Sequence, residues 1–337
     1  MKPCAPLLLI ASLFSLPVFA HHGVAALGAA GLEGPGAPLE TSSSATLPEG
    51  AGLLSYKLDV PKYKVATGTQ DGEADYNHFH LIGVGYGFKP WLSGYAFLPY
   101  SKKVDESGGY NSSGIGDVGL NLVVGFKHDA KGLVLVPDGE SLDDLEEWHF
   151  TVSGGTSLPT GKADIKSPSG ANDPGKATGF GKPTFSLSGT ATKMLSTKLT
   201  GTLEVGFLYF QKREYGNDGT GTPFDFQYGT EKRLNAAMSY RLHTDPARKL
   251  RVDGNIELNY LMLGRDKMNG QGEVGTGGRI LYVVPGVRVS VDKFSVAAGI
   301  KTPISKRLNE DDLAAGQQQG AEGNEKYRLV FAASMLF

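Results

Sequence analysis

The feature that most constrains this chain is a long, strict alternation of apolar and polar side chains. Between residues 250 and 262, the even positions are Leu250, Val252, Gly254, Ile256, Leu258, Tyr260 and Met262. The odd positions are Arg251, Asp253, Asn255, Glu257, Asn259 and then Leu261. At roughly 3.3 Å per residue this segment is about 40 Å long, whereas strands of soluble proteins usually have about 5–6 residues. Such a length, with one apolar face, predicts a strand that crosses a membrane.

The same pattern recurs along the whole chain after residue 50. Clusters of Gly, Asn, Asp, Ser and Pro separate the alternating segments, which is typical of strands joined by turns. Outside the N-terminus no apolar run reaches about 18 residues, so a helical membrane protein is excluded. About twelve strands are predicted, at 51–64, 76–88, 91–102, 113–128, 148–158, 179–193, 198–213, 222–243, 249–265, 276–291, 294–305 and 325–337.

The connections between these segments alternate in length. The short ones are Lys89-Pro90, Met194–Thr197, Thr244–Arg248 and Asp292-Lys293, and the long ones are 65–75, 103–112, 159–178, 214–221, 266–275 and 306–324. Segment 129–147 breaks this rule, and its capping-box-like start at Ser141 predicts a short helix. We therefore expect an all-β, transmembrane antiparallel β-barrel with short periplasmic turns and long outer loops.

The N-terminus has the features of a secretory signal. Lys2 precedes an apolar stretch from Leu7 to Leu16, and Val18-Phe19-Ala20 is a small-residue cleavage site. We predict a signal peptide at 1–20, which contains the only cysteine, Cys4; a Gly/Ala/Pro-rich periplasmic leader at 21–50; and a bacterial outer-membrane barrel at 51–337. The leader has no period, so little packed structure is expected there. It is a candidate to plug the barrel mouth or to dock a periplasmic partner.

The chain end and the aromatic residues fit this interpretation. The last segment is amphipathic and ends on Phe337, which resembles the signal that the barrel assembly machinery recognises. Aromatic rings favour the boundary between outer-membrane lipid and water. The rings near strand ends that we expect at this boundary are Trp91, Tyr95, Tyr100, Trp148, Phe207, Tyr209, Phe224, Phe226 and Tyr228.

The charged faces indicate what the barrel encloses. A Lys or Arg facing lipid at mid-membrane costs about 2–4 kcal/mol, so these faces must point inward. The predicted channel-lining residues are Asp117, Glu204, Arg241, Arg251, Asp253, Asn255, Glu257, Asn259, Arg288 and Arg328. Both signs of charge are present, and we expect a transporter that passes a small-molecule solute through a polar lumen. A net charge of −2 argues against binding to nucleic acid.

Two histidines give the main alternative function. Cleavage after Ala20 would leave His21 and His22 at the mature N-terminus, where an α-amine and imidazoles bind Cu or Ni. In that interpretation the barrel anchors or scaffolds a periplasmic metal or redox partner. No other cofactor is predicted.

Other patterns carry weaker hypotheses. His149 and Ser153 share a face, which leaves a barrel lipid hydrolase as a further alternative, but no third partner is identifiable and an enzyme is not expected. His78 and His80 are expected to line the lumen. The loop at 162–178 is expected to be an outer loop, although it offers oxygen ligands for Ca²⁺ at Asp164, Asn172 and Asp173.

Three glycine-containing stretches resemble those of a known family. They are Ser113-Gly-Ile-Gly-Asp-Val-Gly-Leu120, Gly155-Thr-Ser-Leu-Pro-Thr-Gly161 and Gly179-Phe-Gly181. The first matches G-x-G-x-x-G, but a strand-like segment follows it, so dinucleotide binding is not indicated. The chain is similar to a family of outer-membrane transporter-like proteins named for the meta-pathway of phenol degradation. This resemblance implies a barrel that passes or binds small molecules.

Overall fold

The computed structural model describes residues 36–63, 76–104, 110–138, 146–312 and 325–337. Within these ranges nearly all regular structure is β-strand, with three single-turn 3-10 helices. No helix in the described part of the chain is long and apolar enough to cross a bilayer.

The strands follow the predicted order closely. The long ones are β1 (Gly52–Tyr63), β2 (Tyr76–Lys89), β3 (Leu92–Val104), β5 (Val118–Asp129), β7 (Trp148–Leu158), β8 (Thr184–Ser196), β9 (Leu199–Phe210), β12 (Glu231–Asp245), β13 (Leu250–Leu263), β16 (Gly278–Val291), β17 (Phe294–Leu308) and β18 (Glu325–Leu336). The short elements are β4 (Ser112–Ile115), β6 (Gly132–Leu135), η2 (Pro174–Lys176), β10 (Arg213–Tyr215), β11 (Phe224–Gln227), η3 (Pro246–Arg248), β14 (Lys267–Met268), β15 (Gln271–Gly272) and η4 (Asn309–Asp312).

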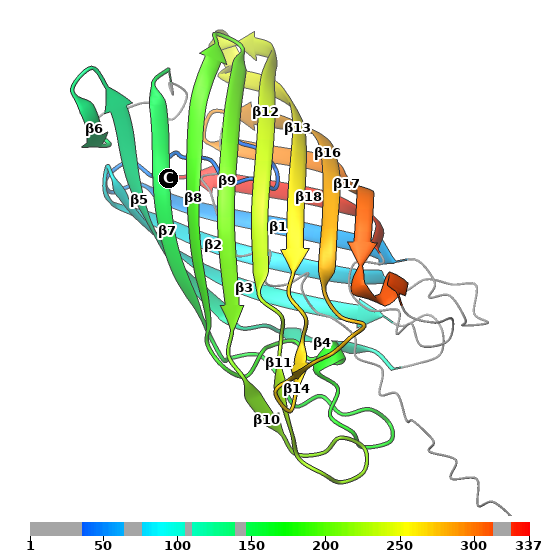
Figure 1. Ribbon diagram of the computed structural model, residues 1–337. Coiled ribbons are helices and arrows are strands. Elements are labelled where there is room, and N and C mark those ends of the chain that lie inside the picture. The colour runs from blue at the N-terminus through cyan, green and yellow to red at the C-terminus, as the bar shows by residue number, and fades with distance from the viewer. Residues whose placement is uncertain (1–35, 64–75, 105–109, 139–145, 313–324) are drawn as a thin grey trace, which may run out of the picture.

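The twelve long strands close into one antiparallel barrel (Figure 1). Each pairs with the next long strand along the chain, and β1 pairs with β18 to complete the ring. The two chain ends of the barrel are tied together, because Gly52 and Phe337 exchange backbone hydrogen bonds of 2.8 and 2.9 Å. The predicted transmembrane β-barrel is therefore confirmed.

The two ends of the barrel differ in their connections. Two-residue turns join β8 to β9 and β16 to β17 at the same end as Gly52 and Phe337. At the other end, long connections carry a small sheet of β10, β11, β14 and β15 (Figure 1). In outer-membrane barrels the short-turn end faces the periplasm, so the long loops face outward.

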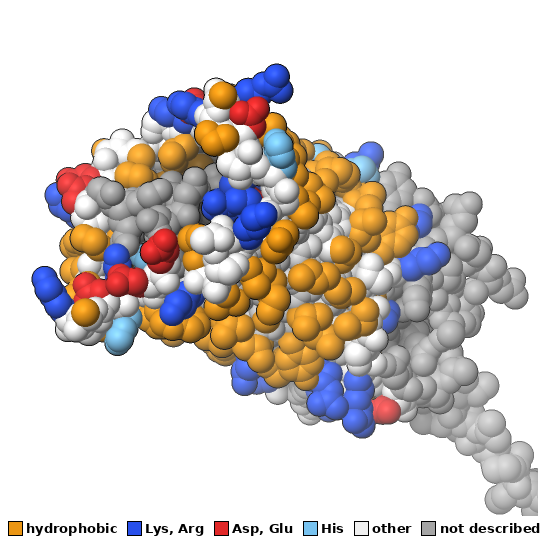
Figure 2. Space-filling view, turned by 90° about the horizontal axis from the view of Figure 1, so that it is seen from above, with side chains coloured by type: hydrophobic (Ala, Val, Ile, Leu, Met, Phe, Trp, Pro, Cys, Tyr) orange, Lys and Arg blue, Asp and Glu red, His pale blue; other side chains and the backbone are white. Residues whose placement is uncertain are grey.

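An apolar belt surrounds the barrel wall. Figure 2 shows a continuous hydrophobic band below a rim of charged side chains. The exposed fraction of Leu187 is 59% and that of Val205 is 58%, although both lie in the middle of strands. An apolar surface of this extent is stable in contact with lipid hydrocarbon and not with water. A closed antiparallel barrel with such a belt is the architecture of bacterial outer-membrane proteins. The chain is therefore located in that membrane.

The wall is interrupted where one continuous strand was predicted at 113–128. β4 ends at Ile115 and β5 begins at Val118, although both pair with β3. Gly116 donates its N–H to the carbonyl of Pro99 at 2.8 Å. The Asp117 side chain turns to the outer loops. The chain bends at Gly116 and Asp117 because their hydrogen bonds do not follow the regular pairing of adjacent strands.

Two further predictions need correction or lie outside the described structure. Segment 222–243 is divided into β11 and β12, and β11 belongs to the small outer sheet instead of the barrel wall. Segment 129–147 contains β6, which extends β5 as a hairpin. The helix predicted from Ser141 lies outside the described residues, as does the signal peptide at 1–20.

Candidate functional site

The barrel is not empty. Residues 36–47, here called the lumen segment, run inside the wall in the half of the barrel that carries the short turns (Figure 1). The segment approaches β13 and β16 first, then β9 and β8, and leaves past β3 to begin β1. Leu47 and Ser44 are fully buried. The prediction of little packed structure is therefore wrong for this part of the leader, because the wall supplies hydrogen-bond partners that the segment lacks on its own.

Charged wall residues hold the backbone of the lumen segment. The Glu257 carboxylate accepts the backbone N–H groups of Leu39 at 2.6 Å and Thr41 at 2.8 Å. The Arg288 guanidinium donates to the carbonyls of Ala37 at 3.0 Å and Pro38 at 2.9 Å. Charge-assisted hydrogen bonds are shorter and stronger than neutral ones. The wall therefore anchors this segment at its peptide groups.

The part of the wall formed by β7, β8 and β9 is lined with small hydroxyl side chains. Ser153 bonds Ser188 at 2.6 Å, Thr151 bonds Thr190 at 2.5 Å, and both pairs join β7 to β8. We call this face the hydroxyl wall. Its members are Thr151, Ser153, Ser157, Thr184, Ser186, Ser188, Thr190, Thr192, Thr200 and Thr202. Because these side chains are small, they leave space beside the lumen segment.

Two cavities occupy that space. The inner one, of about 20 Å³, is bounded by Ser42 and Ser43 of the lumen segment and by the hydroxyl wall. The outer one, of about 80 Å³, has apolar walls at Phe97 and Leu208 together with hydroxyls of β7 and β8. Asn121, Ser186 and Arg233 line both cavities, so the two are adjacent. We call these two adjacent cavities, which lie between Phe180 and the lumen segment, the path.

An aromatic roof covers the outer end of this path. Phe180 lies edge-on to Phe210 and Tyr228, with ring centroids 4.8 and 5.1 Å apart, and it also lines the outer cavity. Tyr215, Phe224 and Phe226 extend the same buried cluster. Phe224, Phe226 and Tyr228 were predicted at the lipid boundary. They pack inward instead, because the small outer sheet folds over the lumen.

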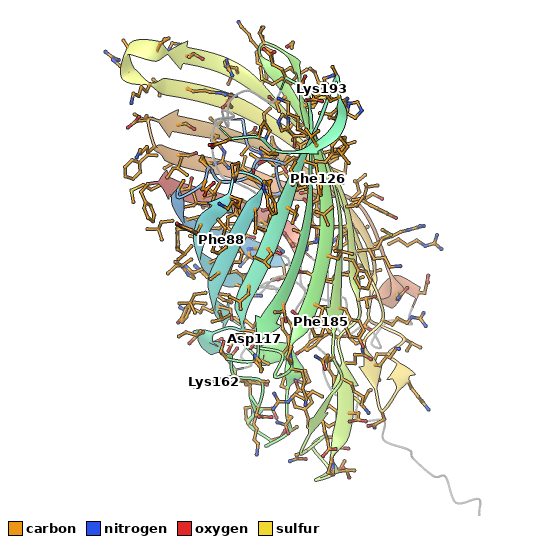
Figure 3. The ribbon with its side chains drawn as sticks, turned by 90° about the vertical axis from the view of Figure 1, so that its left-hand side faces the viewer. Phe88, Asp117, Phe126, Lys162, Phe185 and Lys193 are labelled. Carbon is orange, nitrogen blue, oxygen red and sulfur yellow. The ribbon has the colours of Figure 1, made fainter. Side chains whose placement is uncertain are left out.

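Asp117 fixes the roof to the barrel wall. Its carboxylate accepts the backbone N–H of Gly161 at 2.8 Å and that of Phe180 at 2.7 Å. Figure 3 shows Asp117 beside the loop residue Lys162, at the end away from the labelled Lys193. The interruption between β4 and β5 thus serves to direct a carboxylate at the loop that carries Phe180.

The structure places the predicted lining residues on the lumen side. Most of them bond the lumen segment or neighbouring wall residues and do not line an open path. Asp253 binds the Gly36 N–H at 3.0 Å, and Glu204 binds the Ser42 N–H at 2.9 Å. The others are Arg251, which pairs with Asp253; Asn255, which bonds Ser239; Asn259, which bonds Thr41; Arg328, which pairs with Glu325 and Asp59; and Arg241, on the inward face of β12 opposite Asp253. Their role in ion preference stays a prediction.

The histidine hypotheses have different outcomes. His21 and His22 lie outside the described residues, so metal binding there stays a prediction. His80 faces outward, contrary to expectation, with its Nδ1 atom 2.7 Å from the exposed Tyr56 hydroxyl. His78 stacks on it from the same face of β2. Outward polar rings are tolerated here because they lie near the outer end of the strand, at the membrane boundary.

The remaining candidates have other partners. Ser153 bonds Ser188, whereas the Nδ1 atom of His149 lies 2.9 Å from the carbonyl of Glu147, which does not favour a Ser–His hydrolase pair. Asp164 pairs with Arg213, and Asn172 bonds Asn217. Within the described ranges, no group of three His, Cys, Asp or Glu residues is arranged to hold a metal ion.

Sequence reasoning missed the hydroxyl wall and Tyr95. The alternating Ser and Thr residues of β7, β8 and β9 carried a usable signal, because they occupy the lumen-facing positions of otherwise apolar strands. Tyr95, predicted at the lipid boundary, is buried in the interior and stacks on Phe97.

Comparisons with known proteins identify a family and a solved structure of similar fold. A family model described as "Putative MetA-pathway of phenol degradation" matches residues 61–307. A crystal structure of an outer membrane channel from Pseudomonas putida F1 aligns with a TM-score of 0.64 at 11% identity, covering 89% of this chain and 100% of that one. A monoaromatic hydrocarbon channel aligns with a TM-score of 0.37 at 10% identity, covering 86% and 88%. No curated protein matches the chain. The family match confirms the resemblance that the glycine-containing stretches indicated.

Proposed function

This chain belongs to the family described as "Putative MetA-pathway of phenol degradation". We propose that it is an outer-membrane channel for small solutes that carry an apolar ring and a polar group. The solute enters beneath the aromatic roof and follows the hydroxyl wall. Transport through a barrel requires a lumen that solvates the passing molecule. The outer cavity has apolar side chains on one side and hydroxyl groups on another, so it can solvate both parts of such a solute.

The observation that carries this proposal is the chemistry of the outer cavity. Phe97 and Leu208 offer an apolar surface to a ring, while Ser157 and Ser186 offer hydrogen bonds to a hydroxyl group. Ligand sites commonly combine apolar walls with a few placed polar groups. Phenol has this combination.

The cavity is small, so passage requires movement. It measures about 80 Å³, whereas an engineered apolar cavity of about 150 Å³ binds benzene. Phe180 closes the outer side and Arg233 lies between the two cavities. We infer that rotation of these two side chains admits the ring.

The experiment is blockade of single-channel current in planar bilayers by millimolar phenol. Wild-type protein is expected to show discrete current steps that phenol interrupts reversibly. Ser186→Phe fills the path, so both the current and the phenol effect should fall at least fivefold. Val205→Phe adds the same side chain to the lipid-facing side of β9, where the exposed fraction is 58%, and should leave both unchanged.

Two outcomes contradict the proposal. One is wild-type current that phenol does not interrupt. The other is an equal loss of current in both phenylalanine variants, because this would locate the effect in the fold and not in the path.

A further inference from the structure

The lumen segment carries a single charge, and that charge is paired with the barrel wall. Glu40 is the only charged residue among residues 36–47. One of its carboxylate oxygens accepts a hydrogen bond from Lys57 on β1, and the other accepts one from Lys301 on β17 at 2.6 Å. The side chain of Glu40 is 8% exposed. The two lysines therefore hold one carboxylate between them.

The sheet order explains why two lysines meet at this point. β18 lies between β1 and β17, so the two lysines lie on the strands that flank it, and both bond Glu40. Lys57 pairs in register with Ala332, whose small side chain leaves room between them. Arg328, on the same strand, is engaged by Glu325 at 2.8 Å and by Asp59 at 3.3 Å. The Lys57–Lys301 pair thus holds the Glu40 carboxylate beside a second ion cluster, and Lys57 also lies 3.9 Å from Asp59 of that cluster.

An apolar socket adjoins this site. Leu39, the neighbour of Glu40, packs with Ala297 and Val330 in a buried cluster. Its side chain also lies over two glycines of the wall, since a Cβ at Gly299 would be 2.7 Å from Leu39 Cδ2 and one at Gly286 would be 2.9 Å from it. The absence of side chains at these positions makes space for an apolar group beside the lysines.

The contacts of the rest of the segment differ in kind. Glu257 and Arg288 bind mainly peptide N–H and carbonyl groups, which any sequence would offer. The hydroxyls of Thr41 and Ser44 also bond the wall, but Leu39 and Glu40 are the one place in residues 36–47 where the wall holds an apolar group followed by a carboxylate. This match indicates recognition of a chemical group as well as anchoring of a backbone.

We propose that Lys57 and Lys301 form a binding site for a small solute with a carboxylate on an apolar body, and that Glu40 occupies this site as a tethered competitor. The inference takes from the proposed function only that solutes enter the lumen. A solute carboxylate replaces that of Glu40, its apolar part takes the place of Leu39, and the lumen segment loosens. The buried lysines stay paired throughout, since an unpaired buried charge is strongly unfavourable.

The test is calorimetric titration of the full-length folded barrel in detergent with benzoate. Glu40→Gln removes the competitor and should bind benzoate at least tenfold more tightly than wild type. Adding Lys301→Met to that variant should weaken the binding at least tenfold. Glu49→Gln is the matched control, because Glu49 also precedes β1 but pairs with Lys89 at the exposed surface, and it should behave as wild type. Benzyl alcohol, which lacks the carboxylate, should bind equally to all four proteins.

A second measurement avoids any dependence on the folding of these variants. A nitroxide at Ser43→Cys, in a Cys4→Ser background, reports on the mobility of the lumen segment. Saturating benzoate should mobilise it in otherwise wild-type protein, and benzyl alcohol should not. An immobile nitroxide at saturating benzoate, or equal benzoate affinities in wild type and Glu40→Gln, would overturn the proposal. Phenol blockade of the current tests the channel function separately.

Discussion

The carboxylate of Glu257, in the middle of β13, accepts the backbone N–H of Leu39 at 2.6 Å. The same carboxylate accepts the N–H groups of Glu40 and Thr41 and the Thr41 hydroxyl. One wall residue thus fixes three consecutive peptides of the lumen segment. A hydrogen bond to a charged group contributes about 1.5–3 kcal/mol, so this residue is the principal anchor of the segment.

Glu257→Ala is therefore expected to release the lumen segment while the strands of the barrel wall stay paired. We predict that a cysteine at Ser44, which is fully buried, reacts with a water-soluble maleimide at least tenfold faster in this variant. The control is Glu49→Gln, which should leave the rate unchanged. An unaltered rate in Glu257→Ala would contradict this anchoring role.

Asp117→Ala is expected to loosen the aromatic roof. The substitution removes the acceptor for the N–H groups of Gly161 and Phe180 and should lower the free energy of unfolding by about 1.5–3 kcal/mol. Thermal unfolding in detergent, followed by circular dichroism, measures the change. Asp164→Ala removes an exposed ion pair with Arg213 and should cost less than about 1 kcal/mol. Equal losses in the two variants would count against a special role for Asp117.

The ion pairs of Glu40 predict an unusual pH dependence. Burial alone would raise the pKa of this residue of the lumen segment, but the charges of Lys301 and Lys57 outweigh it and hold the pKa well below the ordinary 4.5. A lowered pKa means that the stabilising charge is present above pH 4.5 and is lost only as the pH falls through the lower value. The difference in Ser43→Cys nitroxide mobility between wild type and Glu40→Gln should therefore be the same at pH 7 and pH 4.5. If that difference is halved at pH 4.5, Glu40 titrates as an ordinary glutamate.

The histidine pair at the predicted mature N-terminus gives an independent prediction. We propose that protein cleaved after Ala20 binds one Cu(II) through the α-amine and imidazoles of His21 and His22. Titration of purified mature protein should show micromolar or tighter binding, lost when both histidines are replaced by alanine. Persistence of binding in the double variant would assign the metal to other residues.

The barrel could be predicted from sequence because lipid imposes a repeating pattern on every strand. Alternation such as that of Leu250–Leu263 admits one arrangement, since reversing it would put Arg251 and Glu257 into hydrocarbon. The lengths of the connections then gave the orientation. This reasoning failed at Phe224 and Phe226, because the same alternation also suits a small sheet that covers the lumen.

The sequence made the leader a candidate plug of the barrel mouth, but the course of the lumen segment along the wall could not be predicted, for a physical reason. Its contacts with Glu257 and Arg288 involve mainly backbone atoms, which leave no pattern in the sequence of residues 36–47. Its one informative residue is Glu40, a lone carboxylate in a stretch of Gly, Ala, Pro, Ser and Thr. The charged strand residues were placed correctly on the lumen side, but sequence alone did not show what they would hold.

Single-channel current through purified protein in planar bilayers tests most directly whether the barrel is a channel that the lumen segment narrows. We predict small, discrete steps for wild type, because only the path along the hydroxyl wall is available, and steps several-fold larger for Glu257→Ala. Flat traces from both proteins, with insertion verified by their protease protection in the same membranes, would show that the barrel is sealed and would contradict the account.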